Sequence, residues 1–259
     1  MNYDELLESH LKYGTTKEDI VKMTEYESIL ENVVIAPWWE HTLFEEIGFT
    51  STQVSTKVFN MAKGNNSFSF IEVKEIGAPL MMEYVLPLGL TKCKNLIFLG
   101  AAGSIDKDIK IGDIVIPEYS ICGDGASRYL NKDLEDEFGK KEYPYGNLTK
   151  DLIKLLDNKK IECHCVPNYS VDTIIGEFYH VDKFIDMGCK TIEMETACLF
   201  KCCNTIKMNV TAIFVVSDNI LVNKSLYSGR SEEEKERKKY TKHNIIPKLV
   251  EDVFQKRYV

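Results

Sequence analysis

Apolar runs and amphipathic segments alternate along this chain, and their spacing predicts its secondary structure. Runs of apolar residues predict short buried strands at 33–36, 54–61, 68–74, 95–99, 114–116, 161–166 and 211–216. Helices are expected within 1–31, at 43–48, 80–90, 148–158 and 194–206, and from the charged tract 231–242 onward. Strands that alternate with helices in this way indicate one α/β domain with a central sheet.

Nothing in the sequence divides the chain into separate units. It contains no internal repeat, low-complexity linker or break in composition, so we expect one domain over residues 1–259, with residues 1–31 as an N-terminal helical extension. The polar residues 126–147 are expected to form an excursion from the core. In 231–242, Glu and Lys recur at three- and four-residue spacing, which predicts a helix face exposed to solvent.

Charge and composition exclude several classes of protein. The chain has 32 Lys and Arg against 40 Asp and Glu, and its net charge of −8 argues against a nucleic-acid partner. No apolar run approaches the roughly 18 residues that indicate a membrane span. The N-terminus lacks the basic and apolar regions of a signal peptide, so we expect a cytoplasmic protein without a membrane partner.

The eight cysteines are expected to remain reduced thiols. Cys163 and Cys165 flank His164, a combination that could suggest a metal ion. The two cysteines lack the usual two intervening residues, and no second pair of ligands is evident. Alternation within 161–166 fits a strand better, and we expect no metal cofactor.

Three apolar strands end in small or acidic residues, at 99–103, 191–197 and 215–219. Ligands bind at the carboxyl ends of strands in open α/β sheets, so these three ends predict one shared site. Each signal also has a purely structural explanation. The glycines fit a tight turn, and the carboxylates of Glu193, Glu195 and Asp218 fit helix or loop capping.

The order of these motifs resembles that of the nucleoside phosphorylase/nucleosidase superfamily. Residues 99–105 and 111–115 resemble its glycine loop and following strand, Glu-Met-Glu at 193–195 its ribose-binding motif, and Ser217-Asp218 its purine-site pair. Residues 76–79 and 124–127 are similar to the uridine phosphorylase branch in particular. The resemblance implies a single three-layer α/β domain in which helices flank a central mixed twisted sheet.

The resemblance also implies a role for each matching position. Glu195 would accept hydrogen bonds from the ribose 2′- and 3′-hydroxyls, Met194 would pack on the sugar, and Glu193 would support the site. Asp218 would bind the purine ring and deliver a proton as the base leaves. Cleavage of a C–N glycosidic bond builds positive charge on the sugar and negative charge on the base, so a carboxylate near the sugar and a general acid near the base fit the reaction.

Other positions complete the expected base site. Asp218 must hold a proton near neutral pH, so burial should raise its pKa. Arg230 lies where the purine branch has an assisting arginine, although an exposed arginine is an equal alternative. Ser217 would contact the base, and the stacking aromatic of the family falls on Ile174, with Phe178 as a substitute. No uridine-type glutamine–arginine pair is found, which favours a purine.

The phosphate site is where the chain departs from the family. It has four arginines, Arg128, Arg230, Arg237 and Arg257, whereas the family places all three phosphate arginines in the region of the first 127 residues. Those arginines fall on Phe98, His41 and Gln53, and the loop hydroxyl falls on Ala101. The backbone from Gly100 to Gly103 could still form a small anion nest. The only tryptophans, Trp38 and Trp39, occupy the place of the phosphate loop and either fill it or stack on a ligand.

These departures leave the acceptor of the sugar open. Family resemblance favours phosphate as co-substrate, with no other cofactor. The missing arginines favour water, which the hydrolytic branch positions with a glutamate; here Trp39 takes that position and Glu40 follows it. A nucleoside-binding protein without catalytic activity is the alternative. By resemblance, we expect a homodimer or a homohexamer.

Overall fold

A single mixed β-sheet organises the chain, of which the computed structural model describes residues 1–256. Its strands are β1 (Asn32–Pro37), β2 (Thr50–Gln53), β3 (Val58–Lys63), β4 (Asn66–Val73), β5 (Asn95–Ser104), β6 (Ile114–Gly123), β7 (Lys141–Glu142), β8 (His164–Val171), β9 (Thr191–Glu193) and β10 (Asn209–Asn219). The strand order is β10-β6-β8-β9-β5-β1-β4-β3-β2, and β7 pairs with β6. Because β10 also pairs with β5, the strands β5, β10, β6, β8 and β9 close into a ring, from which β1, β4, β3 and β2 extend.

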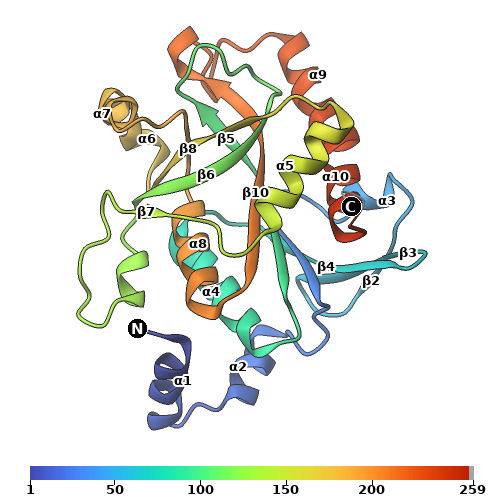
Figure 1. Cartoon of the computed structure of the whole chain (residues 1–259), viewed down its shortest axis with the longest axis vertical. Coiled ribbons are helices and arrows are strands. Elements are labelled where there is room, and N and C mark those ends of the chain that lie inside the picture. Colours follow the sequence, from blue (N-terminus) through green and yellow to red (C-terminus); the bar gives the residue numbers. More distant parts are fainter. Residues whose placement is uncertain (257–259) are drawn as a thin grey trace.

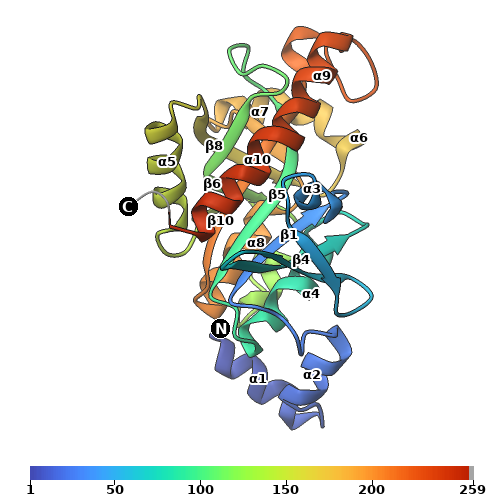
Figure 2. The ribbon, with the colours of Figure 1, turned by 90° about the vertical axis from the view of Figure 1, so that its right-hand side faces the viewer.

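Helices cover both faces of this sheet. They are α1 (Tyr3–Lys12), α2 (Lys17–Thr24), α3 (Thr42–Glu45), α4 (Ala78–Val85), α5 (Leu148–Lys159), α6 (Ile174–Glu177), α7 (Val181–Asp186), α8 (Thr196–Ile206), α9 (Glu232–Tyr240) and α10 (Ile246–Phe254). A π-helical turn, Thr241–Ile245, joins α9 to α10, and short 3-10 turns lie at Leu86–Leu90, Ser127–Leu130, Phe178–His180 and Ile220–Val222. Helices α4 and α8 lie side by side on one face of the sheet (Figure 1). Helix α10 lies on the other face (Figure 2).

The central strands explain these layers. Along β1, Val33 and Ile35 belong to the apolar core under α4 and α8, whereas Val34 and Ala36 belong to the core under α5 and α10. Strands buried on both faces are continuously apolar, which is why this run was readable from sequence. The predicted α/β fold, a central mixed sheet flanked by helices, is confirmed.

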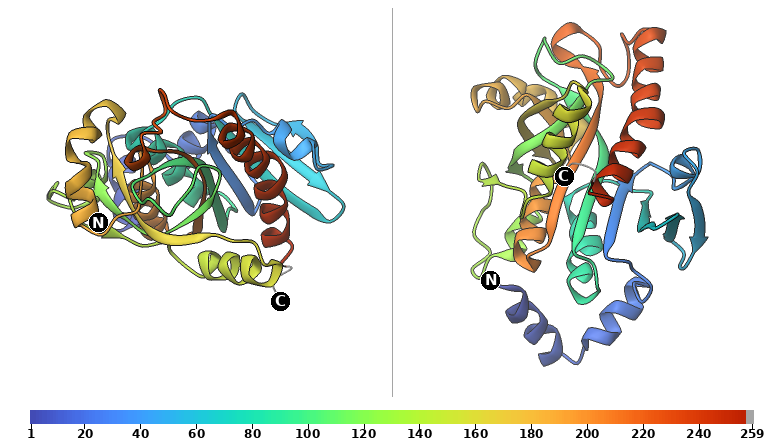
Figure 3. Two further views of the ribbon diagram at one scale, coloured as in Figure 1. Left: turned by 90° about the horizontal axis from the view of Figure 1, so that it is seen from above. Right: turned by 45° about the vertical axis from the view of Figure 1, so that its right-hand side comes forward.

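Helices α1 and α2 form the N-terminal segment and sit at one end of the molecule (Figure 3). The Tyr3 hydroxyl donates to the Leu86 carbonyl oxygen over 2.7 Å. Leu7 of α1 and Ile20 of α2 are buried, and Tyr26 and Ile29 belong to the main core. The segment is thus attached to the domain by apolar packing.

The predicted glycine loop is part of a strand. Gly100 and Gly103 lie within β5 and pair with Phe214 and Asp218 of β10. Neither glycine has a positive φ, so the backbone does not form the alternating conformation of an anion nest. The sequence prediction of a nest is wrong because this segment stays extended to complete the parallel ladder with β10.

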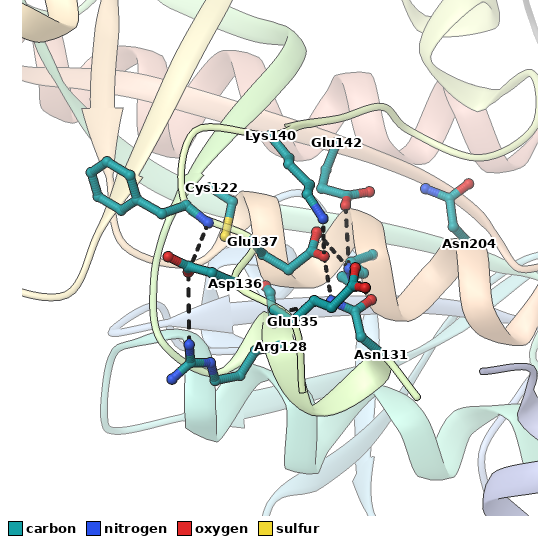
Figure 4. Close-up of polar contacts among 12 residues, drawn as sticks. Cys122, Arg128, Asn131, Glu135, Asp136, Glu137, Lys140, Glu142 and Asn204 are labelled. Atoms are coloured by element: carbon teal, nitrogen blue, oxygen red, sulfur yellow. Dashed lines mark hydrogen bonds and ion pairs between the residues drawn. The ribbon is translucent and has the colours of Figure 1, made fainter. Parts of the chain in front are cut away.

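The excursion between β6 and α5 is anchored to the domain by charge. Glu137 is buried and forms ion pairs with Lys201 of α8 at 2.7 Å and with Lys140 at 2.9 Å. Figure 4 shows Glu137 beside Lys140, and Arg128 facing Asp136, within this excursion. This polar excursion is thus attached to the buried helix α8.

Some elements carry no sequence pattern. Strand β2 is polar and mostly exposed at the edge of the sheet, and β9 has only three residues. Helices α6 and α7 are four and six residues long, too short for a helical period to be visible. Strand β8 starts at His164 and ends at Val171, later than the strand predicted at 161–166.

Candidate active site

The three predicted strand ends meet at one cavity. It measures about 430 Å³ and lies at the carboxyl ends of β5, β9 and β10, next to the end of β1. Its lining comprises Pro37, Trp38, Trp39, Ile76, Phe98, Gly100, Ala101, Gly103, Ile174, Glu177, Ile192, Glu193, Met194, Glu195, Val215, Ser217, Asp218, Leu226, Lys238 and Lys242. The predicted sugar and base residues Glu195 and Asp218 therefore face the same space.

Glu193 anchors the start of α8. One of its carboxylate oxygens accepts from the backbone N–H groups of Glu195 and Thr196, both at 2.8 Å. The other accepts from Asn168 Nδ2 at 2.7 Å and Ser170 Oγ at 2.5 Å. Burial raises the pKa of Glu193, while these four donors favour its ionised form. Capping, the structural explanation considered for both glutamates, applies to Glu193.

Glu195 receives far less support. It occupies the N-cap position of α8 without a capping bond from its side chain, and its Oε1 accepts from the Gly77 N–H at 2.6 Å. The backbone N–H of Met194 also favours the ionised carboxylate. Gly77 has φ of 109°, a conformation that favours glycine. Burial and the neighbouring Glu193 carboxylate raise the pKa of Glu195 to about 8. Its carboxyl group thus faces the cavity with fewer protein donors than that of Glu193.

Asp218 sits beside the glycine of the opposite strand. A Cβ added at Gly103 would lie 3.3 Å from Asp218 Oδ2, so glycine leaves room for this carboxyl. The Ser217 hydroxyl donates to Asp218 Oδ1 at 2.5 Å. Burial raises the pKa of Asp218, in the direction that a general acid requires, against the opposing effects of Ser217 and Arg230.

Arg230 lies next to this pair but does not line the cavity. Its guanidinium donates to the Ser217 carbonyl oxygen at 3.3 Å and to the Leu226 carbonyl oxygen at 2.7 Å. Arg230 is half-buried, and its charge acts to lower the pKa of Asp218. It holds the backbone that carries the Ser217-Asp218 pair.

Glu177 is a site residue that sequence reasoning missed. It ends α6 and lines the cavity together with Ile174, which the family resemblance indicated. Burial and the charge of Asp218 raise the pKa of Glu177 to about 7. Phe178 lies outside the lining and is exposed, so the structure corrects its assignment to the base site; it begins a separate 3-10 turn whose residues are absent from the lining.

Lys238 and Lys242 reach the cavity, although most residues of α9 are exposed, as the predicted solvated helix face requires. Both line the cavity, and Lys242 Nζ lies 4.6 Å from the ring centroid of Trp39. Burial and neighbouring cations lower the pKa of each lysine. The periodicity of 231–242 located the helix but gave no sign of what one of its faces covers.

The degenerate acceptor site is only partly assembled as predicted. Phe98, Gly100 and Ala101 line the cavity, as does Trp38, which has a positive φ of 60°. His41 and Glu40 do not line it. The His41 ring bonds Glu72 Oε1 at 2.6 Å and stacks on Phe59, while Glu40 is exposed.

Comparison with known sequences decides the family. The sequence model described as "Phosphorylase superfamily" matches residues 42–245. The chain belongs to this superfamily. The resemblance stated from the residue motifs is therefore confirmed.

Individual members of the superfamily resemble this chain at low sequence identity. The chain is 29% identical over 186 residues to a purine nucleoside phosphorylase, DeoD-type, of Exiguobacterium sp., covering 70% of this chain and 71% of the relative. It is 32% identical over 170 residues to the corresponding protein of Caldanaerobacter subterraneus, covering 63% and 67%. Their names agree with the predicted class of enzyme.

Solved structures share the superfamily fold at low identity. Uridine phosphorylase from Vibrio fischeri aligns with a TM-score of 0.72 and 17% identity, covering 88% of this chain and 93% of that one. AMP nucleosidase from Bacteroides thetaiotaomicron aligns with a TM-score of 0.65 and 17% identity, covering 98% and 97%. At this identity the likeness concerns the fold.

Two further features bear on the predicted cofactors and partners of this superfamily member. Within residues 1–256, no group of three or more His, Cys, Asp or Glu side chains is arranged to hold a metal ion. None of the helices in the described part of the chain combines the length and apolar character needed to cross a bilayer.

Proposed function

We propose that this protein cleaves the N-glycosidic bond of a nucleoside with a purine base, transferring the sugar to phosphate or to water. The observation that carries the proposal is the shared cavity of Glu195 and Asp218, two carboxyl groups whose surroundings differ. The reaction builds positive charge on the sugar and negative charge on the base, so it requires two carboxyl groups in different environments.

The proposed reaction follows from these positions. Glu195 accepts hydrogen bonds from the ribose hydroxyls and stabilises positive charge on the sugar as the C–N bond breaks. The bonding electron pair stays with the base, and Asp218 gives its proton to a ring nitrogen. An oxygen of phosphate, or of a water molecule that releases a proton to solvent, then forms the new bond to the sugar carbon. Glu193 holds the start of α8, and so the position of Glu195, without contacting the substrate.

A nucleoside panel tests the proposal. Purified protein is incubated with adenosine, inosine, guanosine, uridine and methylthioadenosine, with and without phosphate, while free base and ribose 1-phosphate are followed. We expect release of purines, with Glu195→Ala and Asp218→Ala each lowering the rate at least about a hundredfold. Glu236→Ala, an exposed change on α9, serves as the control.

The panel also separates the alternatives. Base release that requires phosphate supports phosphorolysis, and release without phosphate supports hydrolysis. Binding of nucleosides without any base release would overturn the catalytic proposal in favour of a binding protein. We further propose a homodimer or larger homo-oligomer, by likeness to the family, which sedimentation equilibrium would measure directly.

A further inference from the structure

Two ammonium groups from one helical segment reach the proposed nucleoside cavity. Lys238 lies in α9 and Lys242 in the π-helical turn that follows it, four residues further along. Both line the cavity together with Gly100 and Ala101. They approach it from the C-terminal part of the chain, whereas the arginines of the family belong to the first half.

Neither lysine is neutralised by an ion pair. Within residues 1–256, no carboxylate oxygen lies within 4.0 Å of either Nζ, whereas the buried carboxylates of Glu137, Glu251 and Asp252 are each paired with a lysine. Asp218 acts on Lys238, and Glu40 acts on Lys242, only at longer range. Arg230 adds a third positive charge beside Lys238. The lysine side of the cavity thus carries uncompensated positive charge.

Trp39 fixes the position of one of these charges. Its indole is buried and lies below Lys242 Nζ at 4.6 Å from the ring centroid, a cation–π contact. Trp39 stands where the phosphate loop of the family is expected, so Lys242 is held at that place. Two like charges four residues apart repel each other, and an anion between them would relieve that repulsion.

We propose that Lys238 and Lys242 form a subsite for a phosphate group, in place of the arginines that this chain lacks. The inference rests on the proposed function, since it assigns the cavity to a nucleoside. The shared chemistry is a phosphate oxyanion, from inorganic phosphate as the acceptor or from the 5′-phosphate of a nucleotide substrate. Each ammonium donates charge-assisted hydrogen bonds to its oxygens.

The two tryptophans provide the measurement. Trp38 and Trp39 are the only tryptophans of the chain, and both line the cavity, so intrinsic fluorescence reports on its occupancy. Inorganic phosphate, adenosine 5′-monophosphate and adenosine are titrated separately against the full-length protein. We expect a saturable change with a phosphate-bearing ligand, and Lys238→Met and Lys242→Met should each weaken its binding about tenfold or more.

Matched variants separate charge from folding. Lys239→Met changes an exposed lysine of the same helix and should leave phosphate affinity unaltered. Lys238→Arg and Lys242→Arg retain the charge and should keep most of the affinity. Circular dichroism of each variant verifies that the fold is intact.

The ligands distinguish the two sources of phosphate. Saturable binding of inorganic phosphate assigns the subsite to the acceptor, whereas binding of the nucleotide alone assigns it to the substrate. The proposal is overturned if the wild type binds neither, or if both lysine-to-methionine variants keep wild-type affinities. Adenosine cleavage is scored separately. If both lysine variants still cleave adenosine with the same dependence on phosphate, the subsite is wrong and the proposed function stands. If phosphate binding depends on the lysines but no nucleoside is cleaved, the proposed function is wrong and the subsite stands.

Discussion

The carboxyl groups around the cavity differ in how many donors they receive. Glu193 accepts four hydrogen bonds, Asp218 receives one from Ser217, and Glu195 receives one from Gly77. Burial raises the pKa of each of the three carboxyl groups, and the hydrogen-bond donors around each one oppose that rise. At the residue scale, support by backbone N–H groups separates a positioning glutamate from groups that can exchange protons with a ligand.

Glu177 gives a prediction at this scale. The charge of Asp218 raises the pKa of Glu177. Because such an interaction is reciprocal, we expect an ionised Glu177 to raise the pKa of Asp218. Glu177→Gln removes that repulsion and should lower the pKa of Asp218. The proton needed for base departure is then lost at lower pH, and the alkaline limb of kcat/KM against pH should move downward by about half a unit to one unit. Asp182→Asn, an exposed change in α7, should leave the profile in place. An unchanged limb in Glu177→Gln would contradict the coupling.

The tertiary contacts of a helix and a loop in this protein differ from what their sequence patterns predict. The tract 231–242 has the charge pattern of a surface helix, yet the positions of Lys238 and Lys242 place one side of it over the cavity. The loop between β6 and α5 is polar, yet Glu137 ties it to α8 through Lys201. In both elements a charged side chain that a sequence pattern assigns to solvent makes a contact in the tertiary structure.

The Glu137 contact yields a stability prediction. Burial alone would raise the pKa of Glu137, but hydrogen bonds from Lys201, Lys140 and Asn131 lower it to about 2. Its stabilising contribution is therefore complete above the ordinary pKa of 4.5 and is lost as the pH falls from there through 2. At pH 7, Glu137→Gln should lower the free energy of unfolding by about 3 kcal/mol, because Lys201 loses its buried partner.

Urea denaturation at several pH values measures this effect. The difference between the wild type and Glu137→Gln should shrink steadily below pH 4.5, since the wild-type carboxylate becomes protonated. Glu135→Gln, an exposed change in the same loop, should cost little at any pH. Equal losses for the two variants at pH 7 would show that the loop is not anchored by Glu137.

Most of the cysteine thiols are buried inside the folded domain. Of the eight cysteines, Cys165 is exposed, Cys93 and Cys163 are half-buried, and Cys122, Cys189, Cys198, Cys202 and Cys203 are buried. Burial raises the pKa of Cys122 to about 12 and that of Cys189 to about 11, so these thiols are protonated as well as shielded. Their reactivity therefore reports on the packing of the entire domain.

Thiol titration with a disulfide reagent provides a prediction at this scale. The native protein should show one fast-reacting thiol, which Cys165→Ser removes, whereas the unfolded chain should react at all eight. The five buried thiols should react only at the rate of unfolding. Fast reaction of those five under native conditions would contradict the packing described for α8 and β6.

By itself, the sequence determined the apolar central strands, their order along the chain and the family. Buried strands such as β1 and β5 are continuously apolar, and the Glu-Met-Glu and Ser-Asp motifs are local, so both are readable without a structure. Only the tertiary structure brought Glu177, Lys238 and Lys242 to the cavity and placed His41 and Glu40 outside it. A helical period shows which residues share a face, but what that face covers depends on packing between segments far apart in the chain. For that reason the missing arginines were visible in the sequence, and the cations in their place were not.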